Sequence, residues 1–154
     1  MNQESGRSMI EMLGVLAIMG VLTIGAVGLI SSAMRTQKIS AVNDNVVQMV
    51  TMVRTIHGEY DDFSNMNGTT IFSAIGMSNK NPYGGTYELA VDPSNSRQFI
   101  VIINGLGQSE CESLVAKAWS DSVEYQLSGG KKGGATGDCR GQNGTNSVRI
   151  VFGE

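Results

Sequence analysis

The sequence predicts an α+β fold, in which one long N-terminal α-helix packs on a small antiparallel β-sheet head. Three observations predict it. Residues 12–34 carry no charged side chain at all. Apolar side chains then recur every three or four residues over residues 39–56, as on one face of a helix. The rest of the chain holds four short segments with the composition of β-strands.

The charge-free run over residues 12–34 is long enough to cross a membrane. A membrane helix needs about 20 apolar residues, and this run reaches roughly 34 Å at the helical rise. Taken alone, the run is compatible with a retained membrane helix, a signal peptide cut after Ala33, or a buried core helix. The flanking charges do not orient it, because Arg7 precedes the run and Arg35 and Lys38 follow it.

The helix is expected to continue past the run as an amphipathic segment. One stripe of apolar side chains continues the helical spacing: Ile39, Val42, Val46, Met49, Val53 and Ile56. No proline occurs before Pro82, so nothing breaks the helix over residues 9–59. Its first half is apolar all round, and its second half is apolar on one side only.

The rest of the sequence, residues 61–154, predicts the strands and short helices of the head. Strands are expected at residues 86–91, 99–103, 122–127 and 147–152. A short helix is expected at residues 71–75. Ser109 and Glu112 have the spacing of a capping box, which predicts a second helix over residues 110–118. Because the strands are short and follow one another through turns, we expect an antiparallel sheet laid on the amphipathic half of the long helix.

Composition argues against several classes of function. The chain has 11 basic and 14 acidic residues, for a net charge of −3, so it lacks the basic surplus that holds a nucleic-acid backbone. One His and two Cys leave few ligands for a metal ion. With a single His, no set of nucleophile, base and acid can be assembled. We therefore expect no enzyme activity, catalytic residue, metal, cofactor or nucleic-acid ligand.

Glu11 is the most informative residue, because a carboxylate at the edge of a membrane segment is costly to bury. It follows Gly6-Arg7-Ser8-Met9-Ile10 and precedes the apolar run. This order consists of a short leader ending in Gly, four residues, a Glu and a long apolar helix. It resembles the N-terminus of a type IV prepilin.

The resemblance implies that a prepilin peptidase cleaves after Gly6. Arg7 would become the first mature residue and carry the N-methyl group, although the family usually has a hydrophobic residue there. Glu11 would be the fifth mature residue, which in filaments of this family pairs with the N-terminal ammonium of a neighbouring subunit. The physics agrees, because an unpaired carboxylate in a dry bundle of apolar helices is expensive.

The resemblance extends into the head. The elements in question are Asn81-Pro82-Tyr83, the strand from Phe99, the segment from Ser109, and Cys139 before a terminal strand. Their order is similar to that of type IVb pilins of the toxin-coregulated class, and it implies the αβ-roll of type IV pilins. The expected parts are a leader at residues 1–6, a transmembrane and filament-core helix at 7–34, its amphipathic half at 35–60, and a head at 61–154.

Cys111 and Cys139 are the only two cysteines and lie 28 positions apart. An even pair beyond a membrane segment points to an oxidising compartment. A disulfide bounding residues 111–139 is therefore predicted, with two free thiols as the alternative. A redox-active pair would favour Cys-x-x-Cys spacing, which these two lack.

The function that these features predict is structural. The subunit would be a single-pass inner-membrane protein and would then polymerise into an extracellular pilus fibre, a homo-oligomeric helical filament. Its partners would be the prepilin peptidase and the pilus assembly machinery. A minor pilin or a type II secretion pseudopilin is the near alternative. Two other classes are a signal-anchored periplasmic binding domain and a secreted enzyme cut after Ala33.

Overall fold

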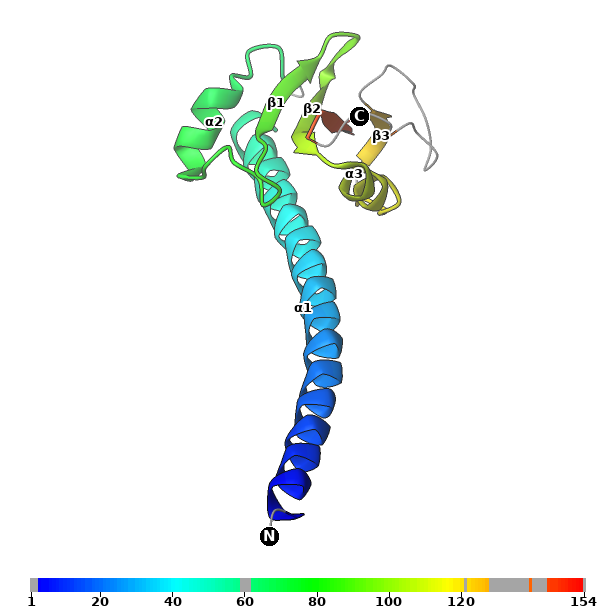
Figure 1. Cartoon of the computed structure of the whole chain (residues 1–154). Coiled ribbons are helices and arrows are strands. Elements are labelled where there is room, and N and C mark those ends of the chain that lie inside the picture. Colours follow the sequence, from blue (N-terminus) through cyan, green and yellow to red (C-terminus); the bar gives the residue numbers. More distant parts are fainter. Residues whose placement is uncertain (1–2, 59–61, 121, 128–138, 140–143, 154) are drawn as a thin grey trace. The chain divides into compact units, whose positions relative to one another are not determined.

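The structure is a computed structural model that describes residues 3–58, 62–120, 122–127, 139 and 144–153, without the side chains of residues 3–7 and 124–127 (Figure 1). The elements along the chain are α1 (Gln3–His57), α2 (Gly68–Ile75), β1 (Tyr87–Asp92), β2 (Asn95–Leu106), α3 (Gln108–Val115), β3 (Ser122–Leu127) and β4 (Asn146–Gly153). Two compact units make up the chain, Met1–Lys38 and Ile39–Glu154.

The second unit contains one four-stranded sheet in the order β1-β2-β4-β3, with every neighbouring pair antiparallel. The predicted sheet is confirmed, with β2 and β4 as its central strands. Their register places Phe99 opposite Phe152, Val101 opposite Ile150 and Ile103 opposite Val148. Because side chains alternate across a strand, these pairs point to one face of the sheet, and all are buried.

The second half of α1 covers that face. Val42, Val46, Met49 and Val53 are buried in one cluster with the inward side chains of the strands, as predicted. The predicted placement of Ile56 in the stripe is wrong, since it is 44% exposed, and Val50 is buried instead. At 3.6 residues per turn, Ile56 lies about 50° and Val50 about 70° from the middle of the stripe, on opposite sides. The period alone therefore slightly favours Ile56, and packing in the core cluster buries Val50 instead.

The short helix α2 is held at both ends by local hydrogen bonds. The Asn67 side-chain oxygen accepts from the backbone N–H groups of Thr69 and Thr70, which caps the first turn. Gly76 ends the helix in the left-handed conformation (φ 65°), where glycine has no steric cost. The predicted helix is confirmed and begins three residues earlier than expected.

The predicted capping box of Ser109 and Glu112 is wrong, because Ser109 is not the N-cap of α3. The helix begins at Gln108, and its N-cap is Gly107, which makes no side-chain capping hydrogen bond. Ser109 instead lies inside the first turn, where its carbonyl accepts from Ser113 Oγ at 2.7 Å. The reason is that β2 extends to Leu106, beyond its predicted end, through a register shift after Ile103. Because the strand ends at Leu106 and the helix begins at Gln108, Ser109 lies inside the helix and cannot be its N-cap.

A buried asparagine ties the loop before β1 to the end of β2. The Asn81 amide donates to the carbonyl of Asn104 at 2.7 Å. Its side-chain oxygen accepts from the N–H groups of Tyr83 and Gly85, each at 3.0 Å. Asn81 is 6% exposed, so these hydrogen bonds satisfy polar groups that water does not reach easily.

Candidate functional site

The first unit is a helix whose described apolar side chains are exposed. Every described side chain from residue 8 to residue 38 is exposed. The large apolar residues between Met9 and Met34 are 54–77% exposed. An apolar surface of this extent is not stable in water. This helical segment therefore requires a bilayer or the helices of other chains around it.

The same helix satisfies the requirements for a membrane span. In the described part of the chain, Ser8–His57 is the one helix that is long and apolar enough to cross a membrane, judged by length and composition. A helix pairs its backbone polar groups internally, which the hydrocarbon core demands.

Two hydroxyl groups in its apolar part are also satisfied internally. Thr23 Oγ1 donates to the carbonyl of Met19 at 2.8 Å, and Ser31 Oγ donates to the carbonyl of Val27 at 3.0 Å. Such bonds, four residues back along the helix, let Ser and Thr enter an apolar environment at lower cost. Sequence reasoning missed this pair, although Thr or Ser at any interior helix position has that carbonyl within reach.

Four glycines of this unit have open space around them in the part of the chain that the structure describes. A Cβ atom added at Gly14, Gly20, Gly25 or Gly28 would meet no atom within 4 Å. The helix nevertheless continues through all four positions. Contacts inside the single chain therefore do not explain why these positions lack a side chain.

The predicted processing and assembly residues lie near the start of α1. Gly6, Arg7 and Glu11 all fall within Gln3–His57. Arg7 and Glu11 are four residues apart in the sequence, which is about one helical turn. Glu11 is exposed between Ile10 and Met12, which are also exposed. Residues 1–2 of the predicted leader lie outside the described residues.

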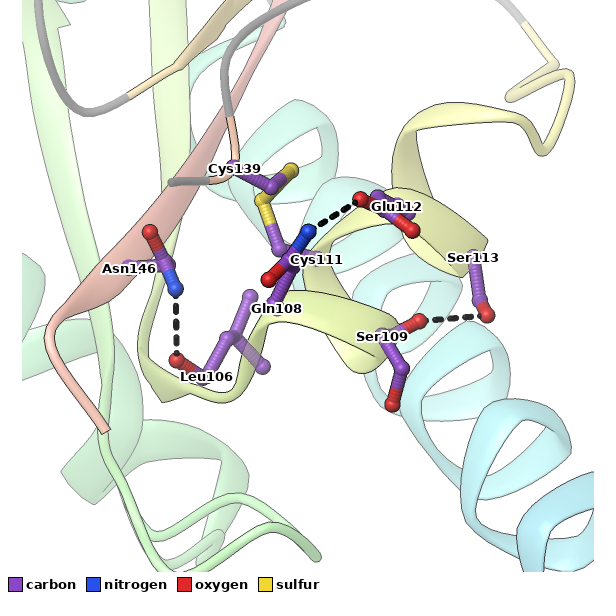
Figure 2. Close-up of a disulfide and its surroundings, with 8 residues drawn as sticks. All are labelled: Leu106, Gln108, Ser109, Cys111, Glu112, Ser113, Cys139 and Asn146. Carbon is purple, nitrogen blue, oxygen red and sulfur yellow. Dashed lines mark hydrogen bonds between the residues drawn. A yellow bond between two sulfur atoms is a disulfide. The ribbon is translucent and has the colours of Figure 1, made fainter. Parts of the chain in front are cut away.

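Cys111 and Cys139 belong to the second unit and form the predicted disulfide, which Figure 2 shows. Their Cα atoms are 5.8 Å apart, and both residues are buried. The alternative of two free thiols is wrong. Cys111 comes from α3, so the bond fixes Cys139 to a helix that packs on the sheet. Within the predicted region 111–139, residues 128–138 lie outside the described residues.

Close to the disulfide, hydrogen bonds join the end of β2 to the start of β4. The carbonyl of Leu106 accepts from Gly144 N at 3.2 Å and from Asn146 Nδ2 at 3.3 Å. Asn146 is fully buried, and Figure 2 shows its side chain directed at Leu106. The start of β4 is thereby held at the end of β2. Sequence reasoning missed Asn146, because an Asn in a polar stretch gives no sign of burial.

Two ionisable groups of the second unit have shifted pKa values. The backbone N–H of Ser64 donates to Asp62 at 2.9 Å, and together with the Ser64 hydroxyl it holds the pKa of Asp62 below its usual value. Burial raises the pKa of the Tyr87 phenol, against the opposing effect of a hydrogen bond from Asn45 Nδ2 at 3.1 Å. The hydrogen bond between Asn45 and Tyr87 links α1 to β1.

The described residues do not assemble a metal site, since no three His, Cys, Asp or Glu side chains come together among them. His57 lies in the last turn of α1, with its ring 6.1 Å from that of Phe63 in an edge contact. Phe63 in turn contacts Phe99 at 4.9 Å. The single histidine thus lies at the border of the aromatic core.

Solved structures of type IV pilins resemble this one. The crystal structure of TcpA, a type IV pilin from Vibrio cholerae El Tor biotype, matches with a TM-score of 0.56 and 12% identity, covering 75% of this chain and 98% of that chain. A type IV b pilin from Salmonella typhi matches with a TM-score of 0.53 and 15% identity, covering 77% of this chain and 99% of that chain. The major type IV pilin PilA1 from Clostridium difficile matches with a TM-score of 0.54 and 12% identity, covering 80% of this chain and 99% of that chain.

The chain has the type IV pilin fold. In sequence, the toxin coregulated pilin of Vibrio cholerae is 30% identical over 128 residues, which cover 73% of this chain and 57% of that protein. The chain therefore spans little more than half the length of this curated relative. No family model matches. The resemblance to type IV pilins, including the type IVb pilins, extends over most of the chain, as the order of its motifs predicted.

Proposed function

We propose that this chain is a structural, non-catalytic pilin subunit that polymerises through residues 7–34 into a type IV pilus. One observation carries the proposal. A unit with the type IV pilin fold follows a helical unit whose large apolar side chains are 54–77% exposed. The hydroxyls of Thr23 and Ser31 are satisfied inside that helix. Such a surface is suited first to a bilayer and then to a bundle of like helices.

The proposed processing begins in the inner membrane. A prepilin peptidase cleaves after Gly6 and leaves Arg7 as the N-terminal residue, which is then N-methylated. The length and apolar composition of the helix support a single membrane pass. The assembly machinery then transfers the subunit from the bilayer to the growing extracellular fibre. Both environments are apolar, so the transfer does not expose the helix to water.

Glu11 sets the register between subunits in this proposal. In a bilayer its carboxylate lies near the interface, where water remains. In the fibre it enters a bundle of apolar helices and needs a cation there. The new N-terminal ammonium of a neighbouring subunit supplies that charge. The guanidinium of Arg7 is a second cation at the same end of the helix, and it is peculiar to this sequence.

The alternatives share part of this physics. A minor pilin or a type II secretion pseudopilin would use the same helix and the same Glu11. A signal-anchored periplasmic binding domain would keep the helix in the membrane and remain monomeric. It would retain Met1 as its first residue, whereas a secreted protein cut after Ala33 would begin at Met34.

The test compares Glu11→Ala, Glu11→Gln and the unchanged chain in the native host at matched subunit levels. Sheared surface fibres are quantified, and mass spectrometry gives the N-terminus of the subunit. We expect Glu11→Ala to be made, inserted and cleaved before Arg7, with a strong loss of fibres. Glu11→Gln keeps the shape without the charge and should give an intermediate yield. Asp44→Asn is the control, because Asp44 is an exposed carboxylate on the same helix.

A normal fibre yield from Glu11→Ala would refute the role of Glu11. A native subunit that begins at Met1 or at Met34 would refute the processing. A subunit found at low copy number within fibres made mainly of another protein would identify a minor pilin.

A further inference from the structure

The second unit has a surface groove that neither polymerisation nor the disulfide accounts for. It lies between α2 and β1 and encloses about 550 Å³. The helix touches the strand at its first residue, since a Cβ added at Gly68 would lie 2.6 Å from the carbonyl oxygen of Leu89. The chain returns to the strand at Asn79, whose carbonyl accepts from Tyr87 N at 2.6 Å. The groove lies between these two contacts, and its volume is typical of small-ligand sites.

The groove does not suit an added peptide strand. Strand addition needs free backbone groups along the outer edge of β1. Gly68 lies against that edge at Leu89, and Asn79 is hydrogen-bonded to it at Tyr87. These two contacts interrupt the edge within three residues, so a small molecule fits the groove better than an extended chain.

The lining combines two aromatic residues, Phe72 and Tyr87, with several polar ones. Phe72, which is partly buried, gives an apolar surface at the wall formed by α2. Around it lie hydroxyls, an amide and a carboxylate, from Thr69, Ser78, Asn79 and Glu88. A sugar ring presents matching chemistry, with C–H faces that pack on an aromatic ring and hydroxyls that both donate and accept.

The charge of the lining residues further limits the class of ligand. Glu88 is the one charged side chain among the residues that line the groove, and none of them is Lys, Arg or His. An anionic ligand would therefore meet a carboxylate with no lining cation to balance it. Glu88 is held in position from the neighbouring strand, because Asn104 Nδ2 donates to its Oε1 at 2.8 Å. A carboxylate has about four acceptor positions, so it can also accept from two neighbouring sugar hydroxyls.

We infer that this groove binds a neutral sugar residue, with Glu88 accepting hydrogen bonds from its hydroxyls and Phe72 packing against its ring. The inference goes beyond the proposed function. It rests on the second unit alone and holds whether or not the chain polymerises. A pilin with such a site would carry one sugar-binding groove on every subunit.

The test uses the full chain, isotope-labelled, in micelles of a zwitterionic detergent that has no sugar headgroup. Methyl glycosides of glucose, galactose and N-acetylglucosamine are titrated, and amide chemical shifts are followed by NMR. We expect at least one neutral glycoside to give saturable shifts at Thr69, Gly76, Ser78 and Leu89. Glucuronic acid should bind about tenfold more weakly or not at all, because of Glu88.

The variants separate recognition from general surface effects. Glu88→Gln should weaken binding of the neutral glycoside by about tenfold and abolish the discrimination against glucuronic acid. Phe72→Leu should weaken binding while keeping an apolar side chain. Glu112→Gln is the matched control, since Glu112 is also exposed and accepts from a side-chain amide, that of Gln108 at 3.0 Å.

Three results would overturn the inference. The first is the absence of saturable shifts at the groove amides for every neutral glycoside up to its solubility. The second is binding at other residues only. The third is an equal effect of Glu88→Gln and Glu112→Gln. A variant whose amide spectrum shows loss of the fold is replaced by Ser78→Ala, which must then weaken binding for the inference to stand. Failure of fibre assembly would change none of these outcomes, so the two proposals are tested separately.

Discussion

The hydrogen bonds of Asn81 should make it one of the most sensitive polar positions of the head. The change Asn81→Ala removes the hydrogen bonds to Tyr83 N, Gly85 N and the carbonyl of Asn104, and a longer one to the carbonyl of Thr86 at 3.4 Å. At about 1 kcal/mol each, the three shorter bonds correspond to about 3 kcal/mol of unfolding free energy. Asn81 is 6% exposed, so water does not readily replace the lost partners, and this value is a lower bound.

A second asparagine supplies the matched control. Asn67 also accepts from two backbone N–H groups through its side-chain oxygen, at 3.0 and 3.4 Å, but it is exposed. Water can take the place of its side chain in Asn67→Ala, so we expect a loss of about 1 kcal/mol, as for other helix N-caps. The expected difference between the two variants is about 2 kcal/mol.

The measurement is urea unfolding of the full chain in a mild detergent, followed by tryptophan fluorescence. The chain has a single tryptophan, Trp119, which is buried, so the signal reports on the head alone. Asn81→Ala should lower the midpoint without a change in slope. If Asn81→Ala and Asn67→Ala cost the same, the buried network would not stabilise the head, and the reasoning would be refuted.

Three further predictions concern the same unit. Cys111→Ser should lower the unfolding free energy by about 3–4 kcal/mol for a loop of this length, and urea unfolding with and without reductant measures it. A reductant that lowers the stability of Cys111→Ser as much as that of the unchanged chain would contradict this. Because burial raises the pKa of Tyr87, the stability from its neutral form is complete below pH 10 and falls as pH rises through the raised pKa. Tyr87→Phe should lack that alkaline loss, and parallel loss in both proteins would exclude Tyr87 as its cause. Deleting residues 1–32 should give a soluble monomeric head, checked by sedimentation; fibres formed by this fragment would disprove a filament core made of residues 7–34.

The sequence by itself predicted the elements that arise from local patterns. A charge-free run and a helical stripe specify α1, because helix period and side-chain polarity are properties of neighbouring residues. Alternating and β-branched segments predicted all four strands, and β3 and the segment from Tyr87 agree with the structure within a residue. The spacing of Gly6 and Glu11 in the sequence is enough to show the resemblance to type IV prepilins.

The tertiary structure decided what depends on residues far apart in the chain. It buried Val50 in the core cluster and left Ile56 exposed, although the helical period slightly favours Ile56. It placed the start of α3 at Gln108, two residues before the predicted start, because β2 extends to Leu106. It also buried Asn81 and Asn146, whose partners, Asn104 and Leu106, lie 23 and 40 residues away. A polar residue gives no local sign of burial when its hydrogen-bond partners come from another part of the fold, so only the assembled head assigns these residues their roles.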